Sequence, residues 1–401
     1  MKFALCILFL SAAASAAPAS RLFAPADHDQ IPVRLIARPT AAASLDRTPV
    51  QIAHTLDGAQ ALAAAPRPFV AQSREFWSEV GESELRAGMR ITTTAPGALV
   101  RLSPQGGAGA ALDPAGVLVR AQGRTQSAAE AASAIADART LRSAGMAVPA
   151  GSLVFRLAPS AGSGEVEIAA PHAQGSYLVH VFEPDSAVVA SLAADRDTVL
   201  VGDTLRLRVS LAGGALMLAS GLVTAPDGYS ADLAFTRTAD GAYEATFTPD
   251  ATHRDGPQLW EAHAFTAARV GARSVLRDAK TAFAVSAPAA RFDGTVTTRH
   301  DADLAIVLGI EAAGASRYQI AGVLYGTGAD GALRPAALAQ SAAWLEAGRG
   351  RIELRFDADT LAAAGVRAPF ELRDLRLIDQ ADMGLLERRE RALAIPQGRS
   401  D

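Results

Sequence analysis

The sequence predicts a mostly β protein built of tandem antiparallel β-sandwiches of the immunoglobulin-like type, with one α-helix inserted in the first domain. Three observations carry this prediction. Short runs of alternating apolar and polar residues recur along most of the chain, as at Leu205–Leu211. Turn sequences such as Pro226-Asp227-Gly228 and Asp240-Gly241 separate these runs. Only Ser127–Ser143 combines helical spacing with dense alanine over a longer stretch.

Residues 1–17 have the features of a secretory signal peptide. Lys2 precedes a short apolar run, Phe3–Leu10, and Ser15-Ala16-Ala17 supplies small residues for cleavage. The apolar run is too short to span a bilayer as a helix. We therefore expect export to the periplasm or beyond, with the signal removed. Cys6 is the single cysteine and lies in this segment, so the mature protein is expected to carry no thiol and no disulfide.

Charge and hydropathy exclude two classes of partner. The chain has 38 basic and 42 acidic residues, and removal of Lys2 with the signal leaves 37 against 42, a net charge of −5. No basic stripe with interleaved aromatic residues is present, so we do not expect nucleic acid as a partner. After the signal, no apolar run is long enough for a membrane span.

The first part of the mature chain divides into two segments. Residues 18–68 are rich in Pro and Ala and are expected to form an extended N-terminal segment, with one short strand possible at Val33–Ala37. Residues 69–185 are expected to form a mainly β domain with a helix over residues 127–143. Ser127 and Glu130 fit a capping box at the start of that helix.

Two further β-sandwiches are expected after residue 185. In residues 186–287, seven short strands separated by turns are typical of an immunoglobulin-like sandwich. Residues 288–396 again show alternating runs, including Gly350–Phe356 and Phe370–Leu377. Residues 397–401 are expected to be a disordered tail.

Turn and strand signatures in these two domains resemble those of bacterial immunoglobulin-like modules. The signatures are Val201–Leu205, Ala225–Gly228, Asp240–Phe247, Tyr318–Tyr325, Leu345–Phe356 and Ala368–Leu372. Such modules occur in exported bacterial proteins as spacers or accessory domains. The three-part layout is similar to an uncharacterised family of gammaproteobacterial exported proteins, of the domain-of-unknown-function type. The resemblance covers about residues 70–395. It implies a fold but no activity, because a fold alone does not specify chemistry.

The sequence offers no catalytic or cofactor-binding set. It has no Gly-x-Ser-x-Gly elbow, and its histidines are scattered. His180 lies in an apolar strand and is expected to be a hydrogen-bonded sheet residue. Glu261 and His263 share one strand face and could lie near His253 and Asp255, but two ligands on a strand are fewer than zinc needs. Three tryptophans could be carbohydrate platforms, although one core or rim aromatic per domain is the simpler interpretation: Trp77, Trp260 and Trp344.

Asp301 and Asp303 are the candidate metal ligands. Two carboxylates two residues apart could offer oxygen atoms to Ca²⁺, but Leu304 begins a strand where an EF-hand loop would continue. We favour a strand-entry turn, and we expect neither a metal nor another cofactor.

These observations predict an exported, non-catalytic, multi-domain β protein that acts in binding or in envelope structure. Its partner would be another protein or a cell-envelope glycan. Pro226–Tyr229 and Thr252–Pro257 are expected to be exposed binding loops. The alternative is a hydrolase or enzyme accessory protein with a site in the first domain, where the predicted helix could form the wall of a cleft.

Overall fold

The computed structural model describes residues 20–39, 45–59, 62, 67–106, 111–253 and 258–397. The predicted signal peptide and residues 398–401 of the predicted tail lie outside this part of the chain. The described residues are mostly β, in antiparallel sheets, with a few short helices. They form two compact units, which we call unit 1 (residues 1–66 and 286–401) and unit 2 (residues 67–285). Unit 2 is therefore inserted in sequence between the two parts of unit 1.

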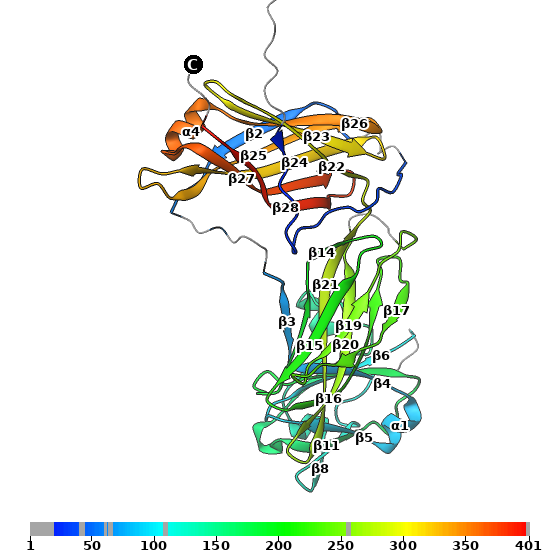
Figure 1. The fold of residues 1–401 in the computed structure, drawn as a ribbon. Helices are drawn as coiled ribbons and strands as arrows, with labels where there is room; N and C mark the ends of the chain where they lie inside the picture. The colour runs from blue at the N-terminus through cyan, green and yellow to red at the C-terminus, as the bar shows by residue number, and fades with distance from the viewer. Residues whose placement is uncertain are drawn as a thin grey trace, which may run out of the picture. The chain divides into compact units, whose positions relative to one another are not determined.

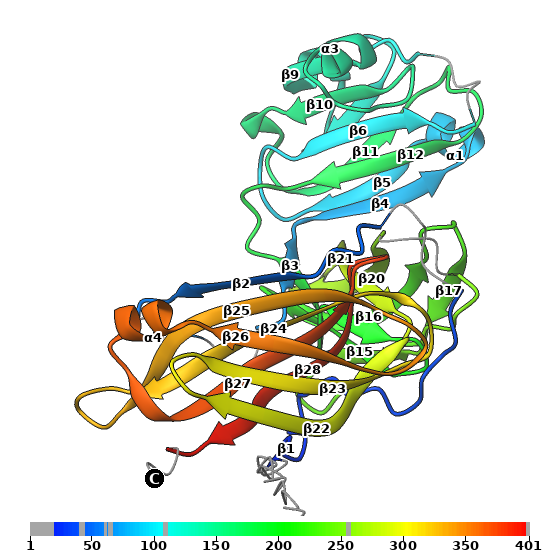
Figure 2. The same ribbon diagram turned by 90° about the horizontal axis from the view of Figure 1, so that it is seen from above.

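Unit 2 begins with a sandwich whose strands come from residues 75–182. One sheet has the order β4-β12-β6-β10-β9 (Figure 2) and the other has the order β5-β11-β7-β8. The bounds of the first set are Glu75–Val80, Tyr177–Phe182, Leu99–Pro104, Leu153–Leu157 and Ala132–Asp137, and those of the second are Met89–Thr93, Gly164–Ala169, Leu118–Ala121 and Arg124–Ser127. Apolar residues from both sheets, such as Phe155 and Ile168, form one buried core. A short helix, α1 (Glu82–Ala87), connects β4 to β5.

The single helix predicted over residues 127–143 is wrong in its middle. The capping box is present, because Ser127 Oγ accepts from Glu130 N–H and the Glu130 carboxylate accepts from Ser127 N–H. However, the helix it starts, α2 (Ala128–Ala131), is a single turn, and β9 follows before α3 (Ala138–Ser143). β9 pairs with β10 through Leu153↔Asp137 to Leu157↔Ala132. Pairing with a distant strand thus overrides the helix propensity of the alanine-rich sequence.

The second sandwich of unit 2 contains the strands of residues 189–286 and one earlier strand. One sheet has the order β17-β16-β20-β21, with β14 also paired to β21, and the other has the order β18-β19-β15-β13-β3. The bounds of the first set are Ser230–Leu233, Ala215–Thr224, Trp260–Val270, Arg273–Ser286 and Thr198–Leu200, and those of the second are Thr236–Arg237, Tyr243–Phe247, Leu205–Ala212, Val189–Ala194 and Val70–Ser73. Leu205, Leu207 and Val209 are fully buried, as their alternation predicts.

The two sandwiches of unit 2 share one ten-stranded sheet. β21 of the second sandwich meets β4 of the first at the residue pair Asp278↔Glu75. β3 pairs with β13 of the second sandwich, and the chain then enters the first sandwich at β4. The predicted division between residues 185 and 186 therefore falls inside one compact unit.

Unit 1 is a sandwich of a four-stranded and a five-stranded sheet. The four-stranded sheet has the order β1-β22-β23-β26 and the five-stranded sheet has the order β2-β25-β24-β27-β28. The bounds are Ser20–Arg21, Ala290–His300, Leu304–Ala312 and Gly348–Phe356 for the first, and Val50–Thr55, Leu333–Leu345, Ser316–Thr327, Arg367–Asp379 and Gly384–Ile395 for the second. Helix α4 (Ala358–Ala364) connects β26 to β27. The core lies between the sheets and contains Ile306, Ile320 and Leu377.

The N-terminal segment is an integral part of unit 1. We call its described residues, 20–39 and 45–59, the N-terminal arm. The blue strand β2 lies beside β25 among strands from the far end of the chain (Figure 1), with the register Val50↔Ala342 to Thr55↔Ala337. Gln30 forms a bridge with Arg388 of β28, and Leu22 and Ala53 pack against the core. The strand expected at Val33–Ala37 is wrong, since those residues form bends and irregular backbone.

Candidate functional site

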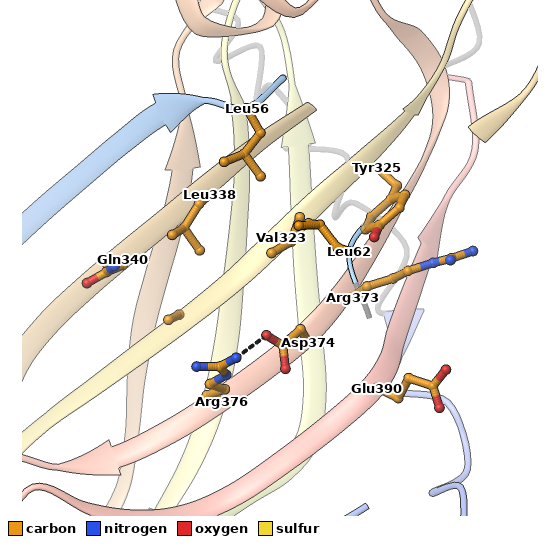
Figure 3. Close-up of a pocket in the computed structure, with 11 residues that line it drawn as sticks. Leu56, Leu62, Val323, Tyr325, Leu338, Gln340, Arg373, Asp374, Arg376 and Glu390 are labelled. Atoms are coloured by element: carbon orange, nitrogen blue, oxygen red, sulfur yellow. Dashed lines mark hydrogen bonds and ion pairs between the residues drawn. The ribbon is translucent and has the colours of Figure 1, made fainter. Parts of the chain in front are cut away.

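A cavity of about 360 Å³ lies on the outer face of the five-stranded sheet of unit 1 (Figure 3). Alternation along the strands decides which residues reach it. On β24, Ile320 and Leu324 belong to the core, whereas Ala321, Val323 and Tyr325 line the cavity. Its volume falls within the range of small-molecule pockets.

A β-bulge in β27 brings three polar residues within four positions to this face. Leu372 and Leu375 are both fully buried in the core, although they are three residues apart and strict alternation would place them on opposite faces. Asp374 takes up the extra residue with a φ of 46°, and the register with β24 shifts across it, from Ala321↔Arg376 to Val323↔Arg373. Bulges of this kind redirect side chains at strand surfaces. Arg373, Asp374 and Arg376 therefore all line the cavity.

The acidic groups of the cavity already have partners. Asp374 pairs with Arg376 through Oδ2, and its Oδ1 accepts from Nε of Arg388 at 2.8 Å. Glu390 on β28 contacts His28 of the N-terminal arm through Oε2. Asp374 is therefore poorly placed to act as a general acid or base, because both of its oxygens are held by arginines.

Arg373 and Tyr325 form the central contact of the cavity. The guanidinium carbon of Arg373 lies 4.5 Å from the centroid of the Tyr325 ring, a cation–π geometry, and its Nε donates to Glu371 Oε1 at 2.8 Å. Burial raises the pKa of the Tyr325 hydroxyl, so this group remains a neutral hydrogen-bond donor at physiological pH.

The apolar part of the lining comes from the strands towards the β2 edge of the sheet, on the same outer face. Leu56 directly follows β2, Leu338 lies on β25, and Val323 lies on β24, with Leu62 beside them (Figure 3). The charged residues lie on β27 and β28. The strand order β2-β25-β24-β27-β28 thus places an apolar half next to a charged half. Such a cavity can hold a ligand that has both kinds of surface.

The predicted site residues of the second and first domains have structural partners. His180 Nε2 lies 2.7 Å from Glu75 Oε2, and its ring stacks on Trp77 with centroids 4.6 Å apart. This agrees with the expected hydrogen-bonded sheet residue. His263 lies with its Nε2 3.8 Å from Asp278 Oδ2. Glu261 pairs with Lys280 at 3.0 Å.

His253 is held at a different place from His263. Its Nδ1 lies 2.9 Å from Asp227 Oδ2, and its ring stacks on Tyr229 with centroids 3.7 Å apart. Asp227–Tyr229 is exposed, as expected for the predicted loop. Asp255 lies outside the described residues, as does most of the other predicted loop. The structure therefore does not gather these histidines into one site.

Asp303 serves the fold of unit 1. It pairs with Arg355 and accepts from the backbone N–H of Ala358, the first residue of α4, at 3.0 Å. The Arg355 guanidinium holds the pKa of Asp303 below its usual range. Asp301 donates its backbone N–H to the carbonyl of Asp303 at 3.2 Å, which is the geometry of a turn. Within the described residues, no group of three or more His, Cys, Asp or Glu side chains is placed to hold a metal.

The cavity residues were not predicted from the sequence. The signal that could have indicated them is the spacing of Leu372, Leu375 and Leu377, in which Arg373-Asp374 breaks an otherwise strict alternation. The contribution of Leu56 could not be inferred in this way, because nothing local in the sequence indicates that β2 pairs with β25.

Two sequence models of one family match the chain. The domain of unknown function (DUF4785) N-terminal domain matches residues 41–183, and the DUF4785 C-terminal domain matches residues 289–396. Together these matches cover more than half of the chain. The chain belongs to the DUF4785 family. This confirms the resemblance to an uncharacterised family that the turn and strand signatures indicated, and the DUF4785 description assigns no activity to the cavity.

Solved structures add a whole-chain similarity of fold. A DUF4785 family protein from Legionella pneumophila is 21% identical, with a TM-score of 0.72, and the match covers 92% of this chain and 99% of that chain. Escherichia coli alpha-2-macroglobulin matches at 8% identity and a TM-score of 0.21, covering 82% of this chain and 23% of that chain. A tandem repeat from the extending region of a large adhesion protein matches at 16% identity and a TM-score of 0.16, covering 73% of each. The last two scores are too low to carry an argument.

Two further findings complete the description of this DUF4785 chain. No curated protein matches it. Among the residues that the structure describes, none of the helices has the length and apolar character needed to cross a membrane.

Proposed function

We propose that this chain is an exported, non-catalytic binding protein, and that the cavity on the five-stranded sheet of unit 1 is its ligand site. The observation that carries the proposal is the cavity itself, in which an apolar wall faces arginine, tyrosine and glutamine side chains. Pockets with a large apolar lining and a few convergent polar groups are the usual form of binding sites. The described side chains that line it include no Ser, Thr, Cys, Lys or His, so this part of the lining offers no hydroxyl, thiol or amine nucleophile of the kinds that an adjacent base activates, apart from the Tyr325 phenol.

Occlusion of the cavity tests the proposal. Leu338→Trp would fill the cavity, whereas Val307→Trp places the same ring on β23, in the other sheet, and serves as the matched control. Each mature protein is incubated with the small-molecule fraction of a bacterial envelope extract, recovered and denatured, and the released molecules are identified by mass spectrometry. We expect the wild-type and Val307→Trp proteins to retain the same compound and Leu338→Trp to lose it. Retention that is unchanged by Leu338→Trp would overturn the proposed site.

The absence of catalysis is tested separately. The alternative of a first-domain enzyme relied on a helix that could form the wall of a cleft, and β9 takes the middle of that helix. We expect a panel of ester, glycoside, peptide and phosphate substrates to show no turnover with the mature protein. Turnover that survives repurification and disappears when the first sandwich of unit 2, residues 75–182, is deleted would restore the enzyme interpretation.

Export is tested on the chain that begins at Met1. The support for export is the pattern of Lys2, Phe3–Leu10 and Ser15-Ala16-Ala17. We expect the protein recovered from the periplasm or medium to have the mass of a chain that begins after Ala17, and to contain no titratable thiol because Cys6 is removed. A Leu8→Arg chain, with its apolar run interrupted, should remain in the cytoplasm. One thiol per exported chain would contradict cleavage.

A further inference from the structure

We propose that the cavity of unit 1 binds an amphipathic anion, in which a carboxylate or phosphate head group is attached to a short apolar chain. This inference rests on the proposed function, because it assigns a ligand class to the same cavity. It follows from two properties of the lining. Its apolar and charged halves are separated, and it has an excess of hydrogen-bond donors that find no acceptor among the described residues.

The unpaired polar groups of the cavity are mainly donors. Arg373 donates through Nε, and no acceptor among the described residues contacts its two Nη atoms. Arg376 binds Asp374 through Nη2, which leaves Nη1 and Nε without a described partner. The Tyr325 hydroxyl and the Gln340 side-chain Nε2 likewise have no acceptor among the described residues, although Gln340 Oε1 accepts from Gln319 at 3.2 Å. A ligand that fits these groups must supply acceptor oxygens.

The charged side chains around the cavity add up to an excess of positive charge. Asp374 is shared by Arg376 and Arg388, and Glu371 accepts from Arg373 and Arg391. Glu390 is engaged with His28. The network therefore contains four guanidinium groups and three carboxylates on β27 and β28. The guanidinium groups are those of Arg373, Arg376, Arg388 and Arg391, and the carboxylates are those of Glu371, Asp374 and Glu390. An anionic head group would complete the charge balance, and arginine binds carboxylate and phosphate with directional hydrogen bonds.

The position of the apolar wall requires an apolar body on that anion. Leu56, Leu338 and Val323 lie beside the charged residues on the same sheet face (Figure 3), because the strands that carry them precede β27 and β28 in the sheet order. An inorganic anion would leave this wall in water, and a neutral sugar would need an aromatic face. The Tyr325 ring is already covered by Arg373 at 4.5 Å. The combination therefore favours a chain with an acidic head over either of those ligands.

Binding of defined probes to the mature protein tests the inference. Octanoate and octyl phosphate carry the two head groups on one chain, octanol lacks the charge, and acetate and inorganic phosphate lack the chain. By titration calorimetry we expect octanoate, octyl phosphate or both to bind, and octanol, acetate and phosphate to bind at least about tenfold more weakly. Whichever of the two charged probes binds more tightly identifies the head group. Octanol that binds as tightly as the charged probes would overturn the inference.

Variants locate the head group in the cavity. Arg376→Gln and Arg373→Gln should each weaken binding of the charged probe by about tenfold or more and leave octanol unaffected. Arg349→Gln, an exposed arginine on β26, is the control and should change nothing. Thermal melting confirms that each variant is folded. Unchanged affinity in both Arg373→Gln and Arg376→Gln would contradict the placement.

The two proposals fail in different ways. If no probe binds, but Leu338→Trp removes a compound that the wild-type protein retains from the envelope fraction, the cavity is a ligand site for another class and only the present inference falls. If Leu338→Trp removes nothing and no probe binds, both fall.

Discussion

A buried aspartate and a half-buried histidine lie together where the two sandwiches of unit 2 share their sheet. Asp278 Oδ2 accepts from the backbone N–H of Trp77 at 2.7 Å and lies 3.8 Å from His263 Nε2. Burial raises the pKa of Asp278 to about 7 from its ordinary 3.8. Burial also lowers the pKa of His263 to about 4 from 6.5. Both groups therefore favour their neutral forms in the native state.

These two shifts act on stability with opposite signs. As pH rises from 3.8 towards 7, the unfolded chain releases the Asp278 proton while the native state keeps it, so the free energy of unfolding falls. As pH falls from 6.5 towards 4, the unfolded chain takes up a proton on His263 while the native state does not, so the free energy of unfolding also falls. Between about pH 4 and 6.5 the two contributions oppose each other, each with a slope of at most about 1.4 kcal/mol per pH unit.

Single variants should separate the two slopes. Asp278→Asn leaves His263 alone, so the free energy of unfolding should rise with pH more steeply than in the wild type across about pH 4.5–6.5. His263→Gln leaves Asp278 alone, so in this variant the free energy of unfolding should rise with pH less steeply than in the wild type, or should fall. Urea unfolding at several pH values gives the free energy of unfolding of each variant. The slopes of these values against pH are compared, because all other groups titrate alike in the three proteins. Three parallel curves would show that neither group titrates differently in the native and unfolded states.

The backbone of Asp374 is a second feature at the residue scale. Its φ of 46° is uncommon for a residue other than glycine, although Asp and Asn tolerate it better than most. Asp374→Asn should therefore keep the bulge, whereas Asp374→Val should lower the free energy of unfolding by about 1–2 kcal/mol more. Both variants remove the carboxylate, so the difference between them isolates the backbone. Equal losses in chemical unfolding would argue that the left-handed conformation is not needed.

Among the elements, the contact between the two sandwiches of unit 2 is fixed by a buried ion pair. Arg277 on β21 is fully buried and pairs with Glu183, which follows β12. Its guanidinium also donates to Thr94 Oγ1 and Ser186 Oγ, each at 3.0 Å, and to the Val188 carbonyl at 3.0 Å. Thr94 follows β5 of the first sandwich, and the other partners lie between β12 and β13, in the segment that connects the two sandwiches. The network therefore ties Arg277 of the second sandwich to the first.

Removal of one partner of this pair should be costly. Arg277→Met leaves Glu183 buried without its cation and should lower the free energy of unfolding by about 3–5 kcal/mol. Arg208→Met, which removes a partly exposed arginine paired with Asp240 and Glu244, should lower the free energy of unfolding much less than Arg277→Met does. Chemical unfolding of the two variants gives the comparison. Arg277→Met together with Glu183→Gln should recover part of the loss, and a double variant no better than Arg277→Met would argue against an uncompensated charge.

For the whole molecule, the main consequence of the fold is that unit 1 is built from both ends of the chain. Arg38 of the N-terminal arm donates to Asp379 Oδ2 at 2.9 Å, and Asp379 is buried. Arg317 on β24 donates to the carbonyl of Thr48 at 2.7 Å. Together with β2, these contacts connect residues separated by about 300 positions in sequence.

Fragments test this architecture. Residues 67–285 are contiguous and should fold alone, whereas residues 286–401 alone lack β1, β2 and the cation that pairs with Asp379. The melting temperature of the 286–401 fragment should lie about 10 °C or more below that of a fusion that adds residues 18–59 to it through a flexible linker. Within the full chain, Arg38→Met should lower the melting temperature of unit 1, and Arg34→Met, at an exposed position of the same arm, should not. A fragment 286–401 as stable as the fusion would refute the role of the arm.

The local features of this protein could be predicted from its sequence. The alternation of Leu205, Leu207 and Val209 correctly placed them in a core, because the side-chain period of a strand depends only on the backbone of that strand. The capping box of Ser127 and Glu130 was also correct, since its hydrogen bonds span three residues. The turn and strand signatures indicated the right kind of family for the same reason.

What only the tertiary structure decided depends on pairing between distant residues. The alternation of a strand tells which face is buried but not which strand lies beside it, so β2 beside β25 and β9 beside β10 could not be inferred. The cavity needs both kinds of information. The bulge at Asp374 has a local trace in the spacing of Leu372 and Leu375, but the apolar wall at Leu56 exists only because hydrogen bonds bring the N-terminal arm to the edge of a sheet formed near the C-terminus.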